Sequence, residues 1–246
     1  MVDINAYIEL YNTGISLSKV KLPNPDENYK IFKSSNVDIR VVDRDKNLNI
    51  LVDRNKFSSI EKFLGDTEEF SHRYFYMIPV QTPSGTITGF ILRTVYGKAY
   101  QTVCKDFSSR IHQVPLMFGW YKDFVDYNNE AKRLPIVICE GPKDCMVLKK
   151  IYKYTLSNNT SSLGTNLEVL RQITNDFVLV YDNDETGIGS MGKDRYKLSN
   201  LLCCCETYHV PNGYKDVSEL IKNKDDFYRF GRKLLTKIKK LQYKCI

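Results

Sequence analysis

The second half of this 246-residue chain alternates short apolar runs with helical segments, and this alternation constrains the fold more than any other feature. The runs IVIC at 136–139 and FVLVY at 177–181 are too short for helices. Gly141 and Pro142 follow the first run and favour the start of a helix. Because strands that alternate with helices usually pair in parallel, the sequence predicts an α/β domain with a mostly parallel sheet flanked by helices.

The first half shows a different pattern, which predicts a mixed α+β subdomain. Turns separate three extended segments, which predict an antiparallel meander: YFYMIPV at 74–80, TITGFILR at 86–93 and AYQTV at 99–103. Further upstream, residues 38–42 and 48–52 are expected to form a hairpin. A polar stretch that ends at Pro135 separates this region from the α/β part.

We therefore expect three regions: a basic N-terminal subdomain at 1–130, an α/β domain at 131–222 and a basic helical tail at 223–246. In the tail, apolar residues recur near helical spacing among many lysines and arginines. A solvated basic face over an apolar packing stripe is the favoured interpretation. Binding of the tail to nucleic acid or to a partner helix stays open.

Composition narrows the class of protein. The chain has 36 Lys and Arg against 29 Asp and Glu, and its net charge of +7 suits a polyanionic partner without identifying one. No apolar stretch approaches the roughly 20 residues that span a bilayer, and the N-terminus lacks a signal-peptide pattern. We expect a cytoplasmic protein without membrane attachment. The cysteines form no C-x2-C pair and the three histidines are scattered, so no structural zinc is expected.

Acidic residues follow the predicted strands of the α/β domain. They are Glu140, Asp144, Asp182, Asp184 and Asp216. In open α/β sheets, ligands bind beyond the carboxyl ends of the strands, so these side chains are expected to converge at one edge. A set of oxygen ligands selects Mg2+ or Mn2+ over zinc. For any single acid, a helix cap or a favourable first-turn charge is the alternative.

Several motifs resemble a known family. ICEGPKDCMVL and VYDNDETG resemble the E-G-x-x-D and D-x-D signature of the Toprim domain. SSLGTNL and HVPNGYKDVSELI look like the SLGT and LPxGKDPDE segments of DnaG-type primases. Upstream, RYFYMIPVQTPSGTITGFILR and PLMFGWYK are similar to further segments of that family, in the same order. The chain thus resembles the RNA-polymerase core of a DnaG-type DNA primase, with its Toprim domain at 131–222.

The resemblance implies a nucleotidyltransferase of DNA replication, a DNA-directed RNA polymerase that makes short RNA primers on single-stranded DNA. Template would lie between the basic subdomain and the Toprim domain. The implied catalytic acids are Glu140, Asp144, Asp182 and Asp184. The implied ligands of Mg2+ or Mn2+, with two ions during catalysis, are Glu140, Asp182, Asp184 and Asp216. The residues implied to bind nucleic acid or nucleotide are Arg73, Arg93, Lys98, Arg110, Lys143 and Lys215.

The implied partners are single-stranded DNA, ribonucleoside triphosphates, a replicative helicase and a separate zinc-binding template-recognition subunit. A compact core of this kind is similar to phage primases, which implies a phage-encoded protein in the host cytoplasm. The family's K-D-P-D-E segment here has Ser218 at an acidic position, with Glu219 next to it. Gln113 stands where the family carries a lysine, although Arg110 is near. A metal-dependent Toprim nuclease and a non-catalytic DNA-binding or accessory protein remain alternatives.

Overall fold

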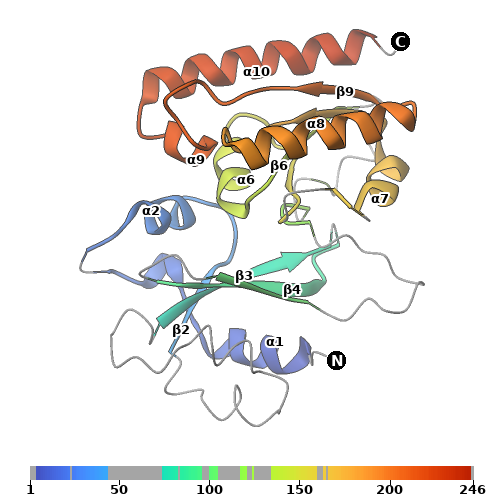
Figure 1. The fold of residues 1–246 in the computed structure, drawn as a ribbon. Coiled ribbons are helices and arrows are strands. Elements are labelled where there is room, and N and C mark those ends of the chain that lie inside the picture. The colour runs from blue at the N-terminus through green and yellow to red at the C-terminus, as the bar shows by residue number, and fades with distance from the viewer. Residues whose placement is uncertain are drawn as a thin grey trace. The chain divides into compact units, whose positions relative to one another are not determined.

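A computed structural model describes residues 4–22, 24–43, 74–82, 84–95, 100–104, 117–120, 124, 134–159, 163–164 and 166–244. The chain divides into two compact units (Figure 1). The first comprises Met1–Thr82 and Thr86–Gln113, and the second comprises Pro83–Gly85 and Val114–Ile246. Among the described residues, each unit contains one sheet. Within the described ranges, no helix is long and apolar enough to cross a bilayer.

The first unit is built on an antiparallel sheet with the order β1-β2-β3-β4-β5. Its strands are β1 (Ile15–Ser16), β2 (Arg40–Asp43), β3 (Tyr74–Gln81), β4 (Ile87–Thr94) and β5 (Tyr100–Cys104). Its described helices are α1 (Ile4–Thr13), the short 3-10 helix η1 (Leu17–Lys19) and α2 (Glu27–Lys33). The meander β3-β4-β5 confirms the prediction. Strand β2 pairs with β1 and β3, and the expected hairpin partner at 48–52 lies outside the described residues.

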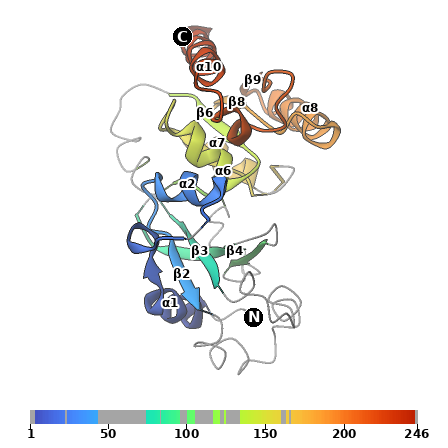
Figure 2. The ribbon, with the colours of Figure 1, turned by 90° about the vertical axis from the view of Figure 1, so that its left-hand side faces the viewer.

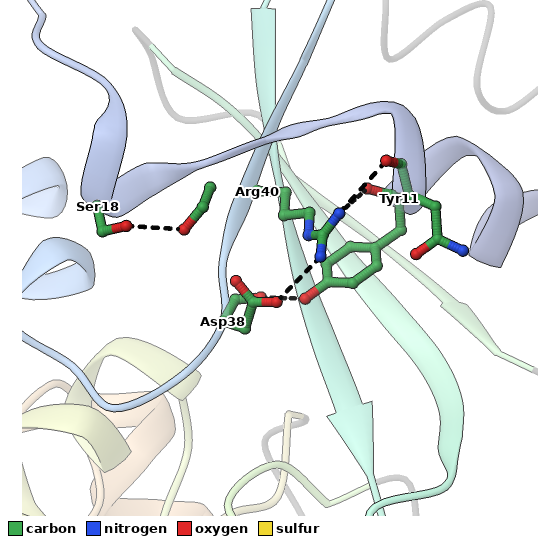
Figure 3. A network of polar contacts seen from close by, with 6 residues as sticks. Tyr11, Ser18, Asp38 and Arg40 are labelled. Carbon is green, nitrogen blue, oxygen red and sulfur yellow. Dashed lines mark hydrogen bonds and ion pairs between the residues drawn. The ribbon is translucent and has the colours of Figure 1, made fainter.

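A polar network fastens the end of α1 to β2 (Figure 3). The Arg40 guanidinium lies over the Tyr11 ring, 4.6 Å from its centroid, and donates to the Asn12 carbonyl at 3.3 Å. It also pairs with the Asp38 carboxylate at 3.4 Å, while the Tyr11 hydroxyl donates to the Asp38 carbonyl. A cation at the last carbonyls of a helix complements the helix dipole. The network therefore orients α1, whose apolar face packs on the sheet.

The second unit has an all-parallel sheet with the order β7-β6-β8-β9. Its strands are β6 (Ile136–Cys139), β7 (Thr155–Ser157), β8 (Asp176–Leu179) and β9 (Cys204–Thr207). Its described helices are α6 (Pro142–Leu148), α7 (Asn166–Ile173), α8 (Glu185–Asn200), α9 (Val217–Leu220) and α10 (Lys224–Lys244). Figure 2 shows the same elements from the side. The predicted α/β class with a parallel sheet is confirmed.

Burial explains why the apolar runs became strands. Every residue of β6 and β8, the two central strands, is buried, as expected for a parallel sheet covered on both faces. Ile136, Ile138 and Phe177 share one core with residues of α7 and α8. Helix α8 begins at Glu185, directly after Asp184, which caps it.

Candidate active site

The acidic residues of the second unit follow three adjacent strands. Glu140 comes directly after β6, Asp182 and Asp184 follow β8, and Asp216 follows β9 and its turn. Because β6, β8 and β9 are parallel neighbours, their carboxyl ends lie at the same edge of the sheet. The backbone N–H of Asp182 donates to Glu140 Oε1 at 3.3 Å, which joins the first two strand exits directly. The N–H of Asn183 donates to the Lys215 carbonyl at 2.6 Å, which brings in the third exit.

Asp184 is both a site residue and a helix cap. Its Oδ1 accepts from the Gly187 N–H at 2.9 Å, which caps α8, and its Oδ2 lies 3.4 Å from Lys215 Nζ. The hydrogen bond from Gly187 lowers the pKa of Asp184, and Lys215 lowers it further. Asp184 therefore has the helix-capping role that is the alternative for a single acid at a strand exit.

Asp144 connects two helices beneath the edge. It is buried in α6, with 7% of its surface exposed, and its Oδ1 accepts from the Ser218 N–H at 2.9 Å. Burial raises the pKa of Asp144 to about 7, and the charges of Asp216 and Asp182 raise it further. Asp144 therefore holds the start of α9 against α6.

The carboxylates of Asp182 and Glu140 are both partly buried, and their negative charges repel each other. Burial raises the pKa of Asp182 to about 7, with the Glu140 and Asp216 charges as the next causes. Burial also raises the pKa of Glu140, against the effect of the hydrogen bond from Asp182, and the Asp184 charge adds to the rise. Lys215 lowers the pKa of both carboxyl groups. The negative charge at this edge thus exceeds what Lys215 offsets.

Ser218 occupies the position at which the primase family that this chain resembles carries an acid. Its N–H donates to Asp144, and its Oγ donates to Asp216 Oδ1 at 2.6 Å. Asp216 Oδ1 also accepts from the Glu219 N–H at 2.7 Å and so caps α9. The Glu219 carboxylate accepts from the Lys215 N–H at 2.8 Å, so it is engaged in the turn before α9. Ser218 therefore links two acids by hydrogen bonds and adds no carboxylate of its own.

Gly187 is a site residue that the sequence analysis missed. A Cβ at this position would lie 2.3 Å from the Asp182 carbonyl oxygen and 2.8 Å from Glu140 Oε1. Any side chain would displace one of the two acidic segments. The signal in the sequence is the glycine three residues after Asp184, in DNDETG.

Asp194 is a second residue that the sequence analysis missed. It is fully buried in α8, and its Oδ2 accepts from the Leu163 N–H and from the Tyr181 hydroxyl, both at 2.9 Å. It therefore ties the SLGT-like segment to α8 and to the chain leaving β8. Asp194 follows Met191 and precedes Leu198 on the buried face of the helix, and an acid on an apolar face is the signal that could have revealed it.

The predicted basic residues are distributed over both units. Lys215 lies beside Asp184, and Lys143 lies in the first turn of α6, one residue before Asp144. Arg93 lies on β4 of the first unit, opposite Tyr76 of β3. The other predicted positions, Arg73, Lys98 and Arg110, lie outside the described residues, as does Gln113.

The donor set suits a hard divalent cation. In the described part of the chain, no three Cys, His, Asp or Glu side chains form a group that could hold a metal ion as they stand. The candidate donors are nevertheless carboxylate oxygens, and burial, with neighbouring negative charge as a smaller cause, raises the pKa of Asp144 and of Asp182 to about 7. Mg2+ and Mn2+ prefer such oxygens. In their chemistry, the residues therefore fit the ions implied by the resemblance.

Comparison with known proteins agrees with this geometry. Residues 137–221 match a family model described as Toprim-like. A DnaG primase catalytic domain bound to single-stranded DNA has a TM-score of 0.60 and 15% identity, with 94% of this chain and 83% of that chain covered. The Aquifex aeolicus primase, with zinc-binding and RNA polymerase domains, has a TM-score of 0.61 and 17% identity, with 95% and 63% covered.

A DNA primase domain from Pseudomonas aeruginosa has a TM-score of 0.61 and 16% identity, with 92% of this chain and 76% of that chain covered. No curated protein matches the chain. At these identities the likeness concerns the fold. The chain therefore has the fold of the DnaG primase catalytic core, and its residues 137–221 are a Toprim-like domain.

Proposed function

We propose that this protein is a DNA primase that synthesises short RNA primers on single-stranded DNA by metal-dependent nucleotidyl transfer. The observation that supports the proposal is that acidic residues follow three neighbouring parallel strands at one edge of the sheet, in a chain with the fold of the DnaG catalytic core. In the reaction, a primer 3′-hydroxyl oxygen bonds to the α-phosphorus of a ribonucleoside triphosphate. The bond between the α-phosphorus and the oxygen that joins it to the β-phosphate breaks, pyrophosphate leaves, and the hydroxyl proton passes to solvent.

The residues divide this work between them. Mg2+ or Mn2+ would be held by Glu140, Asp182, Asp184 and Asp216. When bound, such ions stabilise negative charge on the attacking and leaving oxygens. Asp144 keeps α9, and with it Asp216, in position through the Ser218 N–H.

Basic side chains would bind the phosphates of the template and the nucleotides. Lys215 and Lys143 lie closest in sequence to the acids, and both belong to the second unit. Arg73, Arg93, Lys98 and Arg110 are proposed for template or nucleotide on the resemblance. A replicative helicase and a zinc-binding template-recognition subunit are the proposed partners, and the A. aeolicus primase structure includes a zinc-binding domain.

The test is primer synthesis on single-stranded DNA with labelled ribonucleotides and Mg2+ or Mn2+. The matched variant is Asp182→Asn/Asp184→Asn, because asparagine also caps helices and the change removes charge while keeping the cap of α8. We expect short RNA from the wild type and none from the variant. Nicked DNA with metal alone and without nucleotides would instead support the nuclease.

A further inference from the structure

Helix α10 presents a basic face to solvent that the proposed chemistry does not use. Between Arg229 and Lys240, its exposed positions are Arg229, Arg232, Lys233, Thr236, Lys239 and Lys240. The sequence carries no acidic residue from 227 to 244. At 1.5 Å per residue, the face from Arg229 to Lys240 extends about 16 Å, long enough to meet several consecutive phosphates of one strand.

The opposite face of α10 is fully used in packing, and this fixes the orientation of the basic face. Phe230, Leu234, Ile238 and Leu241 are each at most 2% exposed. Lys237 donates to the Thr207 carbonyl of β9 at 2.5 Å and lies 3.6 Å from Glu206 Oε2. Figure 1 shows α10 running alongside β9 within the second unit. The helix is therefore a rigid support for the cations on its outer side.

Chemistry selects among the possible partners. A membrane-surface helix inserts its apolar face into the bilayer, and here that face is occupied by the protein core. A protein interface needs apolar or aromatic residues at its centre, and the exposed positions from Arg229 to Lys240 are all charged or polar. A row of cations on a rigid helix fits a row of phosphates.

One aromatic residue favours a single strand. Tyr228 precedes the row and is 65% exposed. Bases of an unpaired strand stack on exposed aromatic rings, whereas bases in a duplex are already stacked. The same end of the helix is fastened to the turn that carries Lys215 and Asp216, because the Tyr214 hydroxyl donates to Asp226 Oδ2 at 2.7 Å. Arg229 pairs with Asp226 at 3.2 Å.

We propose that the outer face of α10, from Tyr228 to Lys240, is a binding surface for the phosphate backbone of single-stranded nucleic acid. The surface binds without regard to sequence. It lies on an element separate from the acidic edge and does not depend on the proposed nucleotidyl transfer.

The test is binding of the full chain to a labelled single-stranded oligonucleotide, as a function of salt and with EDTA present. The test variant is Lys233→Gln/Lys240→Gln. The matched control is Lys193→Gln/Arg195→Gln, which removes the same charge from exposed positions on α8 of the same unit. The chelator excludes metal-dependent chemistry, so a failure of the proposed primase activity leaves the result unaffected.

In the test variant, we expect the slope of log affinity against log salt concentration to become shallower by about 1.4, because each of the two lost phosphate contacts contributes about 0.7 to the slope. Its affinity at 0.1 M salt should fall about tenfold, and the control should match the wild type. Tyr228→Ala should weaken single-strand binding about fivefold or more and leave duplex binding unchanged. An unchanged slope, an equal loss in the control, or equal effects of Tyr228→Ala on single strand and duplex would overturn the proposal.

Discussion

The second unit gathers like charges in two regions by different means. At the acidic edge, residues far apart in sequence are brought together at strand exits, and burial with mutual repulsion raises the pKa values of Asp144 and Asp182. On α10, the cations follow one another along a single helix and face solvent. Salt and water screen the repulsion between exposed like charges, and they screen the repulsion between partly buried charges much less. The acidic edge therefore lowers the stability of the fold without a bound cation, whereas the basic face of α10 affects it little.

The largest expected effect on stability comes from removing Asp194, a buried acid that accepts two hydrogen bonds. Asp194→Ala removes the carboxylate that accepts hydrogen bonds from the Leu163 N–H and the Tyr181 hydroxyl, so both donors lose this acceptor. We expect the free energy of unfolding to fall by about 3–5 kcal/mol. Urea unfolding measures this loss. A loss below about 1 kcal/mol would show that these hydrogen bonds do not anchor the SLGT-like segment.

The next largest effect on stability is expected when one of two glycines of α8 is replaced by alanine. Gly187→Ala places a methyl group against Asp182 and Glu140, and it should lower the free energy of unfolding by about 1–3 kcal/mol. The same change should abolish primer synthesis. Gly192→Ala is the control, because a Cβ there has no heavy atom within 4 Å among the described residues. That change should stabilise the protein by about 0.5–1 kcal/mol, since alanine favours helices. Equal effects of the two changes would contradict the close packing at the acidic edge.

A smaller effect is the pH dependence of the metal-free protein. The pKa values of Asp144 and Asp182 lie at about 7 in the folded state, above those of ordinary aspartates in the unfolded chain. The folded state therefore binds more protons between about pH 4 and 7, and stability should rise as pH falls from 8 to 6. Thermal unfolding in EDTA tests this, and Asp182→Asn should flatten the dependence. A rise in stability from pH 6 to 8 would have the wrong sign.

The smallest effect is expected at the basic face. Lys233→Gln/Lys240→Gln should change the free energy of unfolding by less than about 0.5 kcal/mol, because these side chains are exposed and glutamine is a good helix former. Urea unfolding of this variant also checks that a loss of oligonucleotide binding is not a loss of folding. A loss above about 1 kcal/mol would show that the cations stabilise the helix itself.

Local pattern was enough to predict the elements and much of the acidic edge. The alternation of short apolar runs with helical segments predicted the parallel sheet, and the acids after those runs predicted its carboxyl edge. What local pattern could not show depends on contacts between distant segments. The space at Gly187 is closed by Glu140 from another strand exit, and Asp194 gains its partner at Leu163 only in the folded chain. The roles of Arg73, Lys98 and Arg110 stay predictions.

We propose that the acidic edge joins ribonucleotides under the direction of a template. The most direct measurement is incorporation of labelled UMP, with Mg2+ or Mn2+, on single-stranded templates that contain or lack deoxyadenosine. We predict incorporation that requires template deoxyadenosine and disappears in Asp182→Asn/Asp184→Asn. Incorporation independent of the template base, or retained in that variant, would contradict the account.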